Sequence, residues 1–109
     1  MFKMKYIKTT YDVENINYKT LYEYGFRKTY NGEFIYKFIV YKYNKKKPLL
    51  FCEFTLYEEE KQILISVKDI VGNSYNYNKE EFGKSKLIET VNRKIYKELN
   101  LLKKKGIIC

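Results

Sequence analysis

The chain of 109 residues contains no histidine, no tryptophan and no alanine, and it has one proline and two cysteines. Histidine is the usual general base near neutral pH and the commonest metal ligand. Its absence excludes the serine–histidine and cysteine–histidine nucleophile arrangements and histidine-ligated metal sites. We therefore expect a protein that is not an enzyme and that carries no cofactor or metal ion.

The two cysteines are far apart in the sequence and have no spacing typical of a metal site. Cys52 stands inside the apolar run Leu49–Tyr57 and is interpreted as a small core residue, and Cys109 as an exposed thiol. Free thiols are typical of the cytosol. Residues 1–8 alternate charged and apolar side chains, which predicts neither a signal peptide nor a membrane anchor. We expect a cytoplasmic protein with no membrane partner.

Glycine-rich phosphate loops are also missing, because neither GxGxxG nor GxxxxGK followed by serine or threonine occurs.

The acidic cluster of the chain is formed by Glu58, Glu59 and Glu60. Consecutive residues in a tight turn point in different directions, so we interpret this cluster as a solvated turn rather than a cation site. No small-molecule substrate is inferred.

The formal net charge is +9, from 22 Lys and Arg against 13 Asp and Glu. Arg27 and Arg93 are the only arginines, although arginine is preferred where phosphates are held by paired hydrogen bonds. The chain also holds 20 Lys, 13 Tyr, 11 Ile and 9 Asn, all of which have A/T-rich codons. Part of the charge is thus explained by an AT-rich genome, and the size and composition fit an accessory protein or inhibitor from a phage or mobile element.

Aromatic and β-branched residues are concentrated in three runs, Glu33–Tyr43, Leu49–Tyr57 and Gln62–Ile70. The connections between them are short, as in β-hairpins. The pattern predicts three antiparallel strands in a meander, to which Ser74–Tyr77 could add a fourth. Alternation over Phe2–Tyr6 predicts a further short edge strand.

Two helices flank these strands. A short helix is expected within Ile16–Tyr24, with Asn17 as its N-cap and Gly25 as its left-handed end. A long helix is expected over Ser85–Lys104, because five apolar residues share one of its faces: Ile88, Val91, Ile95, Leu99 and Leu102. The sequence therefore predicts a single α+β domain over residues 1–109, with a three- or four-stranded antiparallel sheet.

The order of one helix, three antiparallel strands and a final helix resembles the double-stranded-RNA-binding domain. Gly83-Lys84-Ser85-Lys86 is similar to the basic start of that family's last helix. The resemblance concerns the order of elements from Asn17 to Lys104. The family's loop histidine has no counterpart here, and Leu87 and Ile88 stand where further basic residues would be expected. No functional residue is carried over.

The final helix carries a cationic stripe opposite its apolar face. At about 100° per residue, six side chains fall in one row: Lys86, Thr90, Arg93, Lys97, Asn100 and Lys104. A solvated outer face has this pattern, and so does a surface that binds RNA, DNA or an acidic protein. In the nucleic-acid hypothesis, the residues that contact phosphates are Lys86, Arg93, Lys97 and Lys104.

Successive residues of a strand point to opposite faces of a sheet. If Phe34 and every second residue after it pack on the final helix, the residues between them form a second, aromatic face. The side chains predicted there as a protein interface are Ile39, Tyr41, Tyr43, Phe51 and Tyr57, with Lys37 and Lys68 among them. The alternatives are coverage by the N-terminal elements, a homodimer interface, a partner site, or a platform for single-stranded bases.

We expect a small binding module that contacts another protein, or a second copy of itself, through this second face. The alternative is an RNA- or DNA-binding protein that uses the basic side of the final helix.

Overall fold

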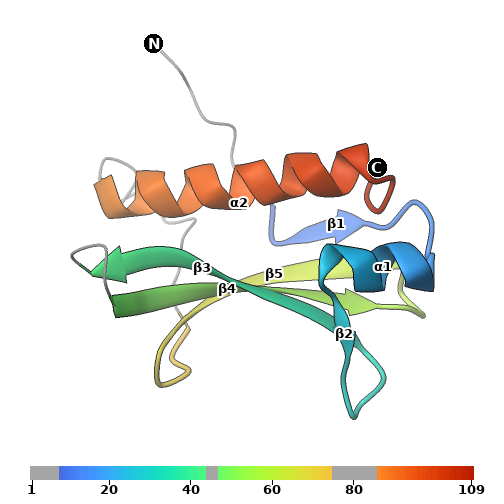
Figure 1. Ribbon diagram of the computed structural model, residues 1–109, viewed down its shortest axis with the longest axis horizontal. Helices are drawn as coiled ribbons and strands as arrows, with labels where there is room; N and C mark the ends of the chain where they lie inside the picture. The colour runs from blue at the N-terminus through green and yellow to red at the C-terminus, as the bar shows by residue number, and fades with distance from the viewer. Residues whose placement is uncertain (1–7, 44–46, 75–85) are drawn as a thin grey trace.

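The computed structural model describes residues 8–43, 47–74 and 86–109. Along the chain the elements are β1 (Thr10–Asp12), α1 (Tyr18–Tyr24), β2 (Arg27–Lys28), β3 (Phe34–Tyr43), β4 (Lys47–Tyr57), β5 (Gln62–Asp69) and α2 (Lys86–Lys104). The strands form one antiparallel sheet in the order β1-β5-β4-β3-β2 (Figure 1). The predicted α+β class and central meander are confirmed, but the sheet has five strands rather than three or four.

Some predicted segments cannot be compared with the structure. The strand expected at residues 2–6 lies outside the described residues, as do residues 75–77 of the possible fourth strand and residue 85 of the final helix. Ser74 forms an isolated bridge with Lys68 beside the end of β5.

The two additional strands lie at the edges of the sheet. β1 pairs with β5 over three residues, and β2 pairs with β3 over two. A tight turn joins β2 to β3, in which the Thr29 N–H donates to the Glu33 carbonyl over 2.7 Å and Gly32 has a φ of +92°. Segments this short carry no periodic pattern of apolar side chains, so periodicity does not reveal them.

The helix α1 begins and ends where the sequence predicts. Asn17 is the N-cap, and its side-chain oxygen accepts a hydrogen bond from the Thr20 N–H. Gly25 ends the helix with a φ of +127°, and the N–H groups of Gly25 and Phe26 both donate to the Leu21 carbonyl. This ending directs Phe26 into the core, where it is fully buried.

The helix α2 packs its apolar stripe against the sheet, as predicted. Its four central core residues are each at most 3% exposed: Ile88, Val91, Ile95 and Leu99. Gly106 ends the helix with a φ of +75°, and the chain then turns back so that the Glu14 N–H donates to the Ile107 carbonyl. Ile107 and Ile108 are buried, so the segment after the helix belongs to the core.

Both helices cover the same face of the sheet. The rings of Tyr18 and Tyr22 in α1 pack on Phe34 of β3, with centroid distances of 5.6 and 5.8 Å. The Tyr24 hydroxyl at the end of α1 donates a hydrogen bond to Glu98 of α2 and thereby joins the two helices. Figure 1 shows α2 running along one side of the sheet. In the part of the chain that the structure describes, no helix is long and apolar enough to cross a membrane.

The covered face includes Cys52, which is fully buried in β4. Burial raises the pKa of its thiol, so the nucleophilic thiolate is disfavoured. The predictions of Cys52 as a core residue and Cys109 as an exposed thiol are confirmed.

A β-bulge interrupts the alternation of β3. Ile39 pairs with Phe51 of β4, but the next pair joins Tyr41 to Leu50, so Val40 is an extra residue in its strand. Leu50 and Val40 belong to the core, and Tyr41 is half-buried against the same core. The prediction that Tyr41 points to the second face is therefore wrong, because the bulge shifts the alternation by one residue.

Candidate functional site

The sheet face opposite the helices is the candidate site, and we call it the open face. Its centre follows from the strand register, in which each row holds one residue of β3, β4 and β5. The rows are Ile35 with Thr55 and Leu64, Lys37 with Glu53 and Ser66, and Ile39 with Phe51 and Lys68. Neither α1 nor α2 packs on this face, since both lie on the side of Phe34 and the buried core.

Charged side chains lie among apolar ones on the open face. The Lys37 Nζ lies 4.6 Å from the centroid of the Phe51 ring, which is a cation–π contact. The Lys68 Nζ lies 3.4 Å from the Glu53 Oε2, and these side chains are 39% and 19% exposed. Ile39, in the same row as Phe51 and Lys68, is half-buried. The open face thus combines apolar surface with two ammonium groups and one carboxylate at its centre.

The structure brings together part of the predicted interface. The side chains that lie on the open face are Ile39, Phe51 and Tyr57. Tyr41 lies on the core side, and the side chain of Tyr43 is outside the described part of the structure. Glu53 was not predicted on this face, although its position between two core residues of a strand is the signal that would place it there.

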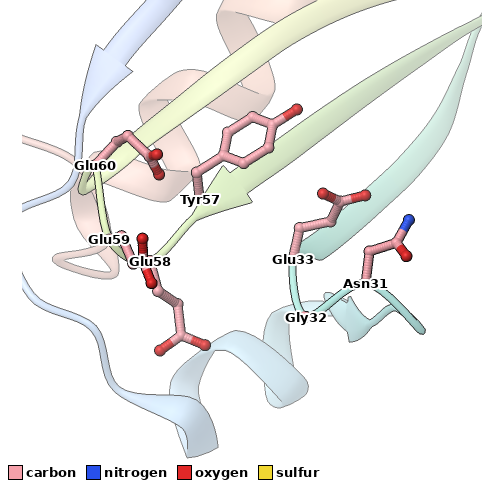
Figure 2. Close-up of a pocket in the computed structure, with 7 residues that line it drawn as sticks. All are labelled: Asn31, Gly32, Glu33, Tyr57, Glu58, Glu59 and Glu60. Carbon is pink, nitrogen blue, oxygen red and sulfur yellow. The ribbon is translucent and has the colours of Figure 1, made fainter.

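A shallow hollow of about 470 Å³ lies where the turn between β2 and β3 approaches the turn between β4 and β5. Figure 2 shows Asn31, Gly32 and Glu33 on one side and Tyr57, Glu58, Glu59 and Glu60 on the other. The Tyr18 hydroxyl donates to the Glu58 Oε2 over 2.7 Å, and this hydrogen bond raises the pKa of Tyr18. The carboxylates point in different directions, and among the described residues no three Asp, Glu, Cys or His side chains are grouped to hold a metal ion.

The cationic stripe of α2 lies on the side of the helix turned away from the sheet. Arg93, Lys97 and Lys104 are exposed, whereas Ile95 between them is fully buried. The Arg93 guanidinium lies 3.4 Å from the Glu89 carboxylate, one turn earlier on the helix. The side chain of Lys86, the fourth predicted phosphate contact, is outside the described part.

The fold has a counterpart among solved structures. A crystal structure of a DUF1831 family protein from Lactobacillus plantarum matches with a TM-score of 0.66 and 15% sequence identity, covering 92% of this chain and 84% of that chain. At this identity the match shows the fold alone. No protein-family model and no curated protein sequence matches the chain.

Proposed function

We propose that this protein is a small binding module without catalytic activity, which contacts another protein through the open face of its sheet. The proposal is carried by the half-buried apolar side chains on a face that neither helix covers, with Ile39 and Phe51 at its centre. Apolar side chains that remain together at a surface are typical of interaction sites.

The central rows of the open face would form part of an interface. Three strands spaced about 4.8 Å apart span about 14 Å, and three rows of side chains spaced about 6.7 Å apart span about 20 Å. The product, about 290 Å², is less than half of the roughly 800 Å² that each partner buries in a standard interface. A partner that buries a standard area would therefore also contact the rim of this face.

Charge favours a different protein over a second copy. The chain carries a net charge of +9, and at the centre of the open face Lys37 and Lys68 accompany the single carboxylate of Glu53. Two open faces placed against each other would bring like charges together, which is unfavourable. A partner surface that combines apolar and acidic side chains would instead pair with the two lysines.

Site-specific photo-crosslinking in the cells that produce the protein tests this proposal. A benzophenone amino acid replaces Phe51 in one variant and Tyr30 in the other, since Tyr30 is a fully exposed aromatic residue in the turn between β2 and β3. We expect a nuclease-resistant adduct with a second protein from position 51 and none from position 30. The added change Ile39→Lys should remove that adduct.

Equal adducts from both positions, or an adduct that disappears after nuclease treatment, contradict the proposal. An adduct between two copies of this chain also contradicts it, and would assign the open face to a homodimer.

A second candidate function is RNA or DNA binding through α2. It is favoured by the exposure of Arg93, Lys97 and Lys104 on the outer side of that helix. If these residues and Lys86 contact phosphates, each contact releases counterions, and log K should fall against log salt with a slope of about −3 to −4. Contacts of this kind carry little base information, so weak sequence preference is expected.

Fluorescence anisotropy with duplex RNA, duplex DNA and single strands at about 50 and 200 mM salt tests this second function. The double variant Arg93→Glu with Lys97→Glu should abolish binding and leave the fold intact, because both side chains are exposed. If no polymer binds more tightly than about 100 μM at the lower salt concentration, nucleic-acid binding is refuted.

A further inference from the structure

The outer edge of β3 is covered only in part by its neighbouring strand. β3 runs from Phe34 to Tyr43, but β2 pairs with its first two residues, Phe34 and Ile35. Beyond Ile35, no strand in the described ranges pairs with the outer side of β3. An uncovered strand edge presents N–H and C=O groups with which another extended chain can pair.

The hydrogen-bond pattern of the β2–β3 hairpin shows which groups face outward. In an antiparallel ladder, the N–H and C=O of every second residue point to the same side. The Glu33 carbonyl accepts a hydrogen bond from Thr29 across the hairpin, so the main-chain groups of Glu33 and Ile35 face β2. Because the direction repeats every two residues, the N–H and C=O groups of Lys37 and Ile39 point to the same side as those of Ile35, which is the outer side of β3. The main-chain groups of Phe38 point to the opposite side and face β4.

The side chains beside this stretch of main chain would contact an added strand. On the covered face Tyr36 and Phe38 are half-buried, and their rings stack with a centroid distance of 5.4 Å. On the open face Lys37 is exposed and Ile39 is half-buried. Apolar surface is thus available on both sides of the edge, which is what an added strand with alternating side chains requires.

The charges along the edge select the chemistry of the added segment. Residues 36–42 include two lysines and no carboxylate, and both Lys37 and Lys42 are exposed. We infer that the outer edge of β3 at Lys37 and Ile39 takes up an extended, acidic segment of a partner protein as a sixth strand. This inference goes beyond the proposed function, because it concerns the main chain of the edge and holds even if the open face binds nothing.

A second copy of this chain fits the edge less well. Pairing two β3 edges would place both Lys37 ammonium groups on the same side of the joint sheet, only a few residues apart. The bulge at Val40 also bends the strand just beyond the pairing stretch. Lysines and bulges on edge strands are features that oppose self-pairing.

Peptide selection followed by amide exchange tests the inference. The probe is a library of random twelve-residue peptides displayed on phage and selected against the full chain. We expect enriched peptides with acidic residues among β-branched or aromatic ones. In NMR exchange measurements, the amides of Lys37 and Ile39 should exchange fast in the free protein and become at least tenfold slower in the complex. The Phe38 amide, which faces β4, should be protected in both states and is the internal control.

Two substitutions at one position separate main-chain from side-chain recognition. Lys37→Pro removes an outward N–H that the β3–β4 ladder does not use, so the sheet should tolerate it at this edge. It should weaken binding of the selected peptide more than tenfold. Lys37→Thr keeps the N–H and should weaken binding less, through loss of the charge alone. The Phe38 amide reports whether each variant is folded.

The inference is overturned if selection yields no peptide that protects Lys37 and Ile39, or if Lys37→Pro binds the selected peptide as the parent does. Peptides that shift residues of β4 and β5 on the open face, without protecting these two amides, would overturn it and leave the proposed function standing. Protection of both amides in the free protein, together with a dimeric mass, would assign the edge to a second copy and also overturn it.

Discussion

The two faces of this sheet are built by the same strands and differ in what buries their side chains. On the covered face of β4, Cys52, Phe54 and Leu56 are fully buried under the helices. Between them on the open face stand Glu53 and Thr55, and Thr55 is 7% exposed although neither helix lies over it. Thr55 pairs with Ile35 on one side and with Leu64 on the other. Because the fully buried apolar side chains lie on the covered face, substitutions there should cost more stability than substitutions on the open face.

The largest loss of stability is expected from a charged substitution on the covered face. Val91→Asp should lower the free energy of unfolding by about 3–5 kcal/mol, because Val91 is fully buried and the new carboxylate would have no compensating charge. Lys97→Asp on the exposed side of the same helix should change it by about 0.5 kcal/mol or less. Urea unfolding measures both, and equal midpoints for Val91→Asp and the parent would show that α2 does not stabilise the sheet.

An intermediate loss of stability is expected in the hairpin of β3 and β4, where the same substitution can be compared on the two faces of the sheet. Tyr41→Lys should cost about 1–3 kcal/mol, because the bulge directs Tyr41 toward the core. Phe51→Lys should cost about 1 kcal/mol, through loss of the cation–π contact with Lys37 and the like charge that it places opposite Lys68. Thermal unfolding of the two variants gives the order. If Phe51→Lys is the more destabilising of the two, the assignment of the faces is wrong.

Sequence patterns predicted the elements whose side chains repeat over several turns or residue pairs. The spacing of Ile88, Val91 and Ile95 identified α2 and its buried stripe, because an amphipathic helix of this length repeats its pattern many times. Local chemistry identified α1, since an Asn17 cap and a Gly25 ending each depend on neighbouring backbone groups alone.

The remaining features depend on contacts between distant segments. The bulge at Val40 is a feature of the register between β3 and β4. Because of it, Tyr41 lies on the core side and not on the face that the sequence predicted. The strands β1 and β2 are too short for a periodic pattern, and burial of Ile107 depends on pairing near Glu14. The open face was therefore predicted only in part, because cross-strand register decides which side chains share it.

Smaller effects than those of Val91→Asp and Tyr41→Lys are expected from the loss of one polar contact on each side of the sheet. The Tyr24 hydroxyl donates to the Glu98 carboxylate in a half-buried site between the helices. Tyr24→Phe should cost about 1–2 kcal/mol, because a hydrogen bond to a charged partner away from water is lost. On the open face, Glu53→Gln removes the partner of Lys68 and should cost about 1 kcal/mol or less, an effect that salt reduces.

Alkaline pH should change the stability of Tyr24→Phe less than that of Glu53→Gln. Burial is the main cause that raises the pKa of Tyr24, and the hydrogen bond with Glu98 is the second. A tyrosine in the unfolded chain has a pKa of about 10. The folded state therefore keeps a proton that the unfolded state loses, so this contribution to stability is present below about pH 10 and is lost as the pH rises toward the folded pKa. The parent and Glu53→Gln should both lose stability between about pH 9 and pH 11, and Tyr24→Phe should lose less. Urea unfolding at the two pH values measures the decline, and an equal decline in parent and Tyr24→Phe would mean that the helices do not shield Tyr24 from water.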